Sequence, residues 1–243
     1  PGLQKPGANV QLEMELPETT FQQKKRRLCC SLAQQQHSER TIFTMNWGKS
    51  DREIWLGGKG IRFLQDLGVT AGEVVVDFGC NAGNYTIPAA ELIGSAGRIY
   101  AIEQDAPALK QLKEWARSHN LKNIVYLNTS QIKEIDLKPH SIDLVLAYDV
   151  LHYFGKAERI KIYIRFYNWL KPDGMLSVFP KHNKQDFPMW HLAELDYEDI
   201  IGEIESTGFR LIEKTEQELI HDDYLENGVI LNFTVSKLNA VGS

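Results

Sequence analysis

The sequence predicts an α/β protein built on a doubly wound, seven-stranded, mostly parallel sheet with an antiparallel hairpin at its C-terminal end. Strands that are apolar throughout alternate with amphipathic helices from residue 73 onward, which is typical of a parallel sheet covered by helices on both faces. No helix separates the last two strands, so we expect them to pair antiparallel at the edge of the sheet.

The composition indicates one globular core. The 243 residues are 43% hydrophobic and 24% charged, which suits one large domain with an extension. The formal net charge of -5 disfavours a nucleic-acid partner. The three cysteines, Cys29, Cys30 and Cys80, lack a metal-type spacing and fit a reducing cytoplasm. Because no apolar run is long enough to span a bilayer and the first thirty residues lack a signal core, we expect a cytoplasmic chain without a membrane span.

The N-terminal part divides into two segments. Residues 1–40 are rich in Gln, Pro, Gly and charge without a sustained period, so we expect a polar, flexible extension. Its "KKRR" run at 24–27 is interpreted as a solvated charge run. Residues 41–70 are expected to form a helical cap, in which Ser50 caps a helix starting with "DREIW" that should stop at Gly68. Such a cap could cover a site on the main domain, residues 71–240.

The main domain begins with alternating strands and helices. "EVVVDF" is a continuous apolar strand, and "APALKQLKEWARSHN" has apolar residues at helical spacing. The β-branched and aromatic residues of "GRIYAIE" and "NIVYLN" favour strands. The expected elements are a strand at 73–78, a helix at 84–93, a strand at 97–103, a helix at 106–120 and a strand at 123–128.

The second half continues the alternation and then changes it. "IDLVLAYD" and "GMLSVFP" are apolar strands, and glycine closes the helix "DYEDIIGEIESTG". "FRLIEKTEQ" and "NGVILNFTVSK" make the final hairpin. The expected elements are strands at 142–149, 174–180, 209–217 and 227–237 and helices at 156–170 and 196–208.

The turn after the first strand, "VVVDFGCNAGNYT" at 74–86, is poor in large side chains. Gly79 and Gly83 permit backbone angles closed to other residues, and Asn81 visits the left-handed region more readily than most. A dinucleotide fingerprint would need glycine at 79, 81 and 84, and the chain has glycine only at the first of these. The P-loop pattern is also missing from the sequence. The turn therefore disfavours NAD and phosphate cradling.

Two acids accompany this turn. Asp77 lies at the end of the first strand, and Glu103 ends the second strand, 20 residues past Gly83. An acid at that position can accept both hydroxyls of a ribose.

Four segments in this order resemble class I S-adenosylmethionine-dependent methyltransferases: "VVVDFGCNAG", "IYAIEQD", "SIDLVLAYDVLHYF" and "LKPDGMLSVF". The resemblance covers residues 50–237, about three quarters of the chain. It implies a Rossmann-like methyltransferase fold, S-adenosylmethionine as the cofactor and an enzyme that transfers methyl groups by in-line displacement.

The resemblance also assigns cofactor contacts. Asp77 would hold the methionine amino group through water, Gly79 would line the amino-acid moiety, and Glu103 would bind the ribose. The remaining expected contacts are Cys80, Asn81, Gly83, Gln104, Gln131, Ile132 and Tyr148. Three positions depart from the family pattern: Asn81 replaces a glycine, Gln104 replaces an apolar residue against adenine, and Gln131 with Ile132 replaces an acid with a small neighbour.

The acceptor is expected beyond the fourth strand, near His152. This histidine titrates near neutrality and is the candidate general base, with packing under the following helix as the alternative. Tyr85, just beyond the turn, either points at the methyl group that is transferred or packs as an aromatic ring at the start of the helix. His182, His191 and "HDDY" at 221–224 are expected on the same rim. No metal site is expected there, because their spacing matches no known ligand pattern.

Absent motifs narrow the acceptor to a small molecule. "YDVLHYF" lacks the Asn/Asp-Pro-Pro motif of related amino methyltransferases, and no cysteine follows the fourth or fifth strand, as carbon-5 pyrimidine enzymes require. Two alternatives stay open: a protein or RNA methyltransferase that docks its substrate through "KKRR", and a non-catalytic S-adenosylmethionine-binding module that serves a partner. The sequence leaves the oligomeric state open.

Overall fold

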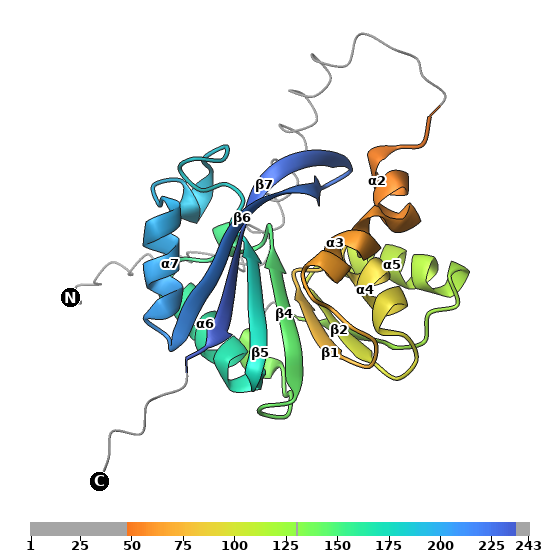
Figure 1. Ribbon diagram of the computed structural model, residues 1–243, viewed down its shortest axis with the longest axis horizontal. Helices are drawn as coiled ribbons and strands as arrows, with labels where there is room; N and C mark the ends of the chain where they lie inside the picture. Colours follow the sequence, from red (N-terminus) through yellow and green to blue (C-terminus); the bar gives the residue numbers. More distant parts are fainter. Residues whose placement is uncertain (1–47, 130, 237–243) are drawn as a thin grey trace, which may run out of the picture. The chain divides into compact units, whose positions relative to one another are not determined.

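A computed structural model describes residues 48–129 and 131–236 of the chain. The extension 1–40, with its "KKRR" run, Cys29 and Cys30, lies outside these residues. One sheet has the order β3-β2-β1-β4-β5-β7-β6 (Figure 1). The strands are β1 Val74–Phe78, β2 Arg98–Glu103, β3 Ile124–Asn128, β4 Ile142–Tyr148, β5 Leu170–Phe179, β6 Phe209–His221 and β7 Tyr224–Val235.

The sheet is parallel except at its hairpin. Strands β1 to β5 pair in parallel, while β7 lies antiparallel between β5 and β6. This confirms the predicted fold class. The hairpin ladder is longer than predicted, because pairing continues to His221 opposite Tyr224. The segment "HDDY", expected as a connection, therefore forms the end of the ladder and its turn.

Helices cover both faces of the sheet (Figure 1). One core cluster joins the sheet to α4 and α5, and a second joins the opposite face to α6 and α7. Residues of each strand alternate between the two clusters, as Val75 and Val76 show. The main helices are α4 Thr86–Ile93, α5 Ala106–Ser118, α6 Lys156–Trp169 and α7 Tyr197–Glu205.

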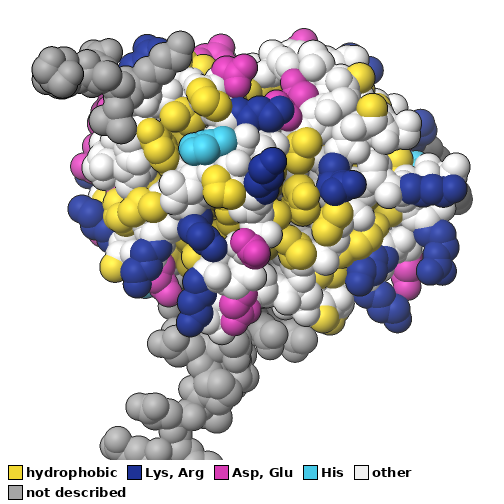
Figure 2. All heavy atoms as spheres, turned by 90° about the horizontal axis from the view of Figure 1, so that it is seen from below, with side chains coloured by type: hydrophobic (Ala, Val, Ile, Leu, Met, Phe, Trp, Pro, Cys, Tyr) yellow, Lys and Arg dark blue, Asp and Glu magenta, His cyan; other side chains and the backbone are white. Residues whose placement is uncertain are grey.

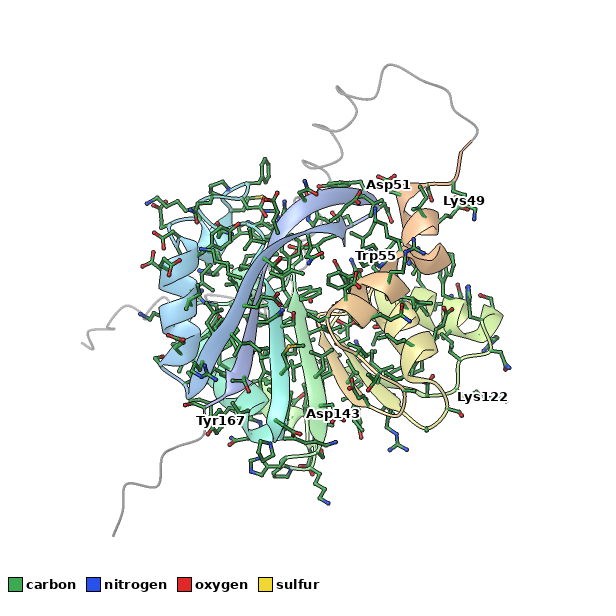
Figure 3. All side chains as sticks on the ribbon, viewed as in Figure 1. Lys49, Asp51, Trp55, Lys122, Asp143 and Tyr167 are labelled. Carbon is green, nitrogen blue, oxygen red and sulfur yellow. The ribbon has the colours of Figure 1, made fainter. Side chains whose placement is uncertain are left out.

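The cap is interrupted where one helix was expected. Ser50 and Glu53 form the predicted capping box at the start of α2 Asp51–Ile54. A π-helical turn, η1 Trp55–Lys59, follows because Gly58 has a φ of 128°, and α3 Gly60–Asp66 continues from it. Asp51 accepts a hydrogen bond from the backbone of Leu225 in β7 at 2.9 Å, so the cap reaches the hairpin (Figure 3).

Figure 2 shows lysine and arginine side chains spread over one face of the molecule, with hydrophobic and a few acidic side chains between them. Within the described residues, no helix combines the length and apolar character needed to cross a bilayer.

Candidate functional site

The turn after β1 is tied to the end of β2. The backbone amides of Gly79 and Cys80 donate to the Ile102 carbonyl at 2.9 and 3.1 Å. Asn81 has a φ of 47°, as expected for a residue that tolerates the left-handed region. Gly79 has a φ of 83°, and a Cβ there would lie 2.4 Å from Val150 Cγ2. Glycine is therefore required at this position by backbone angle and by packing inside the protein.

Glu103 is 2% exposed and bonded to the turn. Its Oε2 accepts from the Asn81 amide at 3.0 Å, and its Oε1 accepts from the Asp105 amide at 2.8 Å. An ionised carboxylate can accept several hydrogen bonds through its two oxygens. Its chemistry therefore suits the two hydroxyls of a ribose.

Asp77 lies on the α4 side of β1 and is 3% exposed. Thr86 Oγ1 donates to its Oδ2 at 2.5 Å. Burial raises the pKa of Asp77 to about 7, the Thr86 hydrogen bond opposes the rise, and the nearby Glu103 adds to it. A bound cation would favour the carboxylate form, so this acid suits an ammonium group. The donor set of the two acids thus fits S-adenosylmethionine.

Asn128, the last residue of β3, links this strand to the residues that follow β2. Asn128, which pairs with Glu103 in the sheet, donates from Nδ2 to the carbonyls of Glu103 and Gln104 at 2.9 and 3.0 Å. Gln131 is exposed, and Ile132 begins the short helix η2 Ile132–Glu134. Their adenine contacts stay predictions. Asn128 was missed, although its place at a strand end next to an acid was a usable signal.

Tyr85 and Tyr148 form an aromatic wall beside the turn. Their rings pack edge to face at 4.7 Å, and Trp55, Phe63 and Phe179 extend the group. The Tyr85 hydroxyl donates to the Ile220 carbonyl at 3.0 Å, and burial raises the pKa of both tyrosines. These contacts pack Tyr85 between the turn and the hairpin, and its place at the transferring methyl stays a prediction.

Four side chains meet where β4 and β5 end and the hairpin turns. They are Asp149, His152, His182 and His221, which we name the rim cluster. Asp149 Oδ1 lies 3.4 Å from His152 Nδ1 and 3.7 Å from His182 Nε2, and its Oδ2 lies 3.0 Å from His221 Nε2. The three histidines are 1%, 1% and 2% exposed. His191, expected on the same rim, is exposed and is not in either acid–histidine group found among the described residues.

The charges of the rim cluster are set by Asp149. Burial works to raise the pKa of Asp149, but the three histidines hold it well below its usual range. Burial works to lower the pKa of His221, yet Asp149 raises it to about 9, so His221 is a cation at neutral pH. Burial lowers the pKa of His182, an effect that Asp149 only partly offsets. The cluster therefore combines a carboxylate, a charged histidine and a neutral one.

The rim cluster lies directly beside the turn after β1, which we call the cofactor turn. Val150, next to Asp149, packs on Gly79, and Tyr85 bonds to Ile220, next to His221. Asn84 joins the same parts: its Nδ2 donates to the Asp222 carbonyl at 2.6 Å, while its Oδ1 accepts from Arg52 of the cap at 2.8 Å. Asn84 carried no separate signal in the sequence, because its partners Arg52 and Asp222 are distant along the chain.

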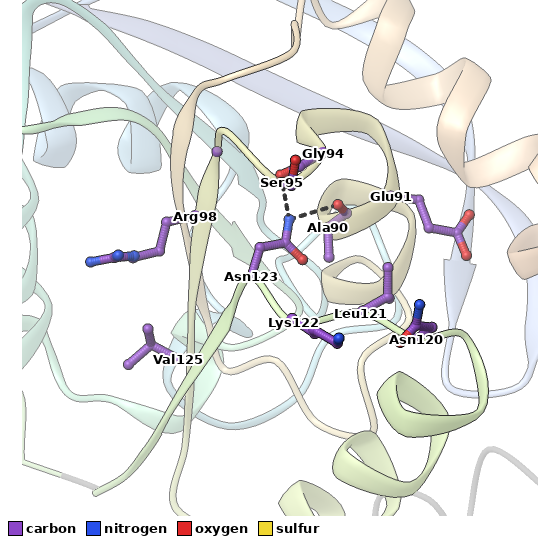
Figure 4. A pocket seen from close by; sticks show the side chains of 11 residues that line it. Ala90, Glu91, Gly94, Ser95, Arg98, Asn120, Leu121, Lys122, Asn123 and Val125 are labelled. Atoms are coloured by element: carbon purple, nitrogen blue, oxygen red, sulfur yellow. Dashed lines mark hydrogen bonds between the residues drawn. The ribbon is translucent and has the colours of Figure 1, made fainter.

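A surface hollow of about 510 Å³ lies at the opposite ends of the strands (Figure 4). Arg98, the first residue of β2, and Asn123 before β3 line it. Asn123 donates to the carbonyls of Ala90 and Gly94 at 2.8 and 2.9 Å. Parallel sheets bind ligands at the carboxyl ends of their strands, so this hollow is separate from the site.

Comparisons with known proteins identify a methyltransferase domain in this chain. A methyltransferase-domain family model matches residues 76–176. A probable cobalt-precorrin-6B C(15)-methyltransferase (decarboxylating) of Saccharolobus solfataricus is 31% identical over 84 residues, 34% of this chain and 42% of that protein. A demethylmenaquinone methyltransferase of Lactobacillus johnsonii is 26% identical over 117 residues, 48% of this chain and 47% of that protein. The chain spans less than half the length of these curated relatives.

A solved structure shares the fold. The SAM-dependent methyltransferase from Aquifex aeolicus has a TM-score of 0.60 at 19% identity, covering 72% of this chain and 89% of that one. At this identity the likeness concerns the arrangement of the sheet and its helices.

Proposed function

We propose that this chain, which belongs to the class I S-adenosylmethionine-dependent methyltransferases and has S-adenosylmethionine as its cofactor, methylates a small molecule at the rim cluster. The observation that carries the proposal is that the turn after β1 contacts the chain neighbours of the rim cluster: Val150, next to Asp149, packs on Gly79, and Asp222, next to His221, accepts a hydrogen bond from Asn84. A donor site and an acceptor site that touch are what a direct transfer needs.

The chain holds the cofactor through its two acids. Glu103 takes the ribose hydroxyls, and Asp77 takes the ammonium group through water. S-adenosylmethionine supplies the activated methyl and a good leaving group, so the protein contributes positioning and exclusion of water. The buried ring of Tyr148 and the cap residue Trp55 serve that exclusion.

The rim cluster acts on the acceptor. An acceptor hydroxyl must lose its proton to become a good nucleophile, and the cluster supplies titratable nitrogens and a carboxylate for that purpose. The ring of Trp190 stacks on His152 at 4.9 Å, and Phe187 is 41% exposed close by, 5.9 Å from the His182 ring. The apolar part of an acceptor has a surface to lie on there.

Two observations favour a small molecule. The curated relatives are named for methylation of a precorrin and a demethylmenaquinone, both small molecules. The net charge of -5 works against nucleic acid. A non-catalytic module is the weaker alternative, because a module that only binds the cofactor does not need three buried histidines around one carboxylate.

The test is a screen of purified full-length protein with S-adenosylmethionine against a metabolite extract. We expect a compound whose mass rises by one methyl group together with S-adenosylhomocysteine. Methyl transfer only into protein or RNA in the extract would favour a protein or RNA methyltransferase. Cofactor binding without any methylated product, across extracts of diverse origin, would favour the module.

A further inference from the structure

We propose that Asp149, His152 and His182 bind one divalent transition-metal ion, specifically Zn²⁺, at the acceptor side of the site. The proposal rests on the proposed function for its role, since it states how the rim cluster would act on an acceptor hydroxyl. No such site was expected from the sequence, because its ligands come from two separate connections and match no known spacing.

The spacing of the three side chains fits a metal ion. Each offers one ligand atom, and these atoms all lie within 4.8 Å of one another. Asp149 Oδ1 is 3.4 Å from His152 Nδ1 and 3.7 Å from His182 Nε2. Zinc bonds of about 2.0–2.1 Å in a tetrahedron separate neighbouring ligand atoms by about 3.4 Å. The two distances from Asp149 are therefore close to those of a zinc site.

The tautomer of His182 leaves two acceptor atoms facing each other. His182 Nδ1 lies 3.0 Å from the Phe187 carbonyl, which can only accept, so Nδ1 carries the hydrogen. In the neutral ring, the form in which histidine binds a metal, Nε2 then carries a lone pair and lies 3.7 Å from Asp149 Oδ1. Asp149 Oδ1 is buried and accepts no hydrogen bond within the described part of the chain. A cation between these atoms would bind both.

The surrounding groups resemble those that orient metal ligands. The other ring nitrogen of a ligating histidine usually donates to a carbonyl or carboxylate, as His182 does to Phe187. His221 Nε2 lies 3.0 Å from Oδ2 of Asp149, while Oδ1 of the same carboxylate faces the other two histidines. Tyr224 holds the far side of His221, with 2.6 Å between its hydroxyl and Nδ1.

The backbone around the cluster is strained in a way that is common at functional sites. Five non-glycine residues in and beside it have left-handed angles: Asp149 (φ 51°), His182 (φ 68°), Phe187 (φ 47°), Trp190 (φ 51°) and Asp222 (φ 50°). Such angles persist only where the surrounding structure enforces them. Here they direct Asp149 and His182 inward from the ends of β4 and β5.

Two histidines with one carboxylate leave a coordination position open, as catalytic zinc sites do. Zinc also suits a reaction that moves no electrons between metal and substrate. A hydroxyl acceptor at the open position would have a lowered pKa, and its proton would pass to water while the oxygen keeps the electron pair. The site thus predicts an acceptor with a hydroxyl group.

The test is zinc binding by full-length protein that has been stripped with a chelator, measured by competition with a chromophoric chelator, without cofactor or acceptor. We expect one ion per chain for the wild type and for His191→Ala, the matched control from the same connection. His182→Ala and Asp149→Asn should bind at least about tenfold more weakly. Asparagine tolerates the left-handed angle at position 149, so this second variant keeps the backbone. Binding of S-adenosylhomocysteine by each variant reports whether it is folded.

The cobalt form provides a second measurement on the wild type. Co²⁺ should give visible bands of a low-coordinate nitrogen and oxygen site. An intense thiolate band would assign the ion to cysteines and overturn the proposal. Less than one ion per wild-type chain, or equal affinity in His182→Ala and His191→Ala, would overturn it as well. Any of these results leaves methyl transfer untouched, whereas zinc binding without methylation of any metabolite would count against the proposed function alone.

Discussion

The carboxylate of Glu103 and the backbone amide of Asn81 are joined by a 3.0 Å hydrogen bond between the end of β2 and the turn after β1. Asn81 holds its left-handed angle at the other end of this bond. The acid and the turn are therefore arranged together before any ligand arrives, and preorganised contacts of this kind lower the cost of binding.

Replacement of Glu103 should weaken cofactor binding without slowing chemistry. Because the carboxylate would bind the ribose equally in ground and transition states, Glu103→Ala should raise the KM for S-adenosylmethionine about ten- to a hundredfold and change kcat much less. Steady-state kinetics on the identified acceptor measures both constants. Glu91→Ala, in the hollow away from the site, is the control. An unchanged KM in Glu103→Ala would remove the ribose assignment.

The pKa of Asp77 predicts how cofactor affinity depends on pH. This pKa is raised to about 7 from 3.8, so below pH 7 the acid must lose a proton to hold an ammonium group. Affinity for S-adenosylhomocysteine should therefore fall as the pH drops below about 7, by up to about tenfold per unit. Tyr85 and Tyr148, which also face Asp77, stay neutral in this range because burial raises their pKa values.

The same shift has a consequence for stability. A raised pKa in the folded state contributes stability that is present below about pH 4 and is lost as the pH rises through about 7. Asp77→Asn should remove both dependences. Calorimetric titrations and urea unfolding between about pH 5.5 and 8 measure them, and parallel curves for the variant and the wild type would refute the role of Asp77.

Loss of His152 should affect chemistry and spare cofactor binding. Whether this histidine takes the acceptor proton or binds a metal ion that lowers the acceptor pKa, it acts on the acceptor side. His152→Ala should lower kcat by about two to four powers of ten. Affinity for S-adenosylhomocysteine should stay within about twofold of the wild type, well inside the roughly 1.4 kcal/mol of a tenfold change. An undiminished kcat of His152→Ala, under conditions where methyl transfer limits the rate, would show that His152 only packs and takes no part in the chemistry.

Tyr85→Phe separates a packing role from a catalytic one. The change removes the hydroxyl that donates to the Ile220 carbonyl, leaving a buried acceptor without its bond, so the free energy of unfolding should fall by about 1–3 kcal/mol. If Tyr85 only packs, kcat should change less than about threefold. A much larger loss of kcat with unchanged stability would give the hydroxyl a catalytic role.

The fold was predicted from local patterns, whereas the candidate site depends on which distant segments the sheet brings together. Glu103 and Asn81 were found because a strand end and a glycine turn have known positions in a parallel sheet. His152, His182 and His221 were expected on the same rim, but their meeting around Asp149 was not predicted. Their meeting depends on the register that brings the hairpin turn to the ends of β4 and β5, which no local pattern specifies. Asn128 was missed because its partners, the carbonyls of Glu103 and Gln104, belong to a neighbouring segment that only the pairing of β2 with β3 brings close.

The central claim is that the turn after β1 and Glu103 form an S-adenosylmethionine site. Calorimetric titration of the full-length protein with S-adenosylhomocysteine and, separately, with NAD tests it most directly. We expect one molecule of S-adenosylhomocysteine to bind per chain and NAD to give no saturable heat, because the chain lacks the second and third glycines of the dinucleotide fingerprint. Saturable NAD binding with no binding of S-adenosylhomocysteine would contradict the account.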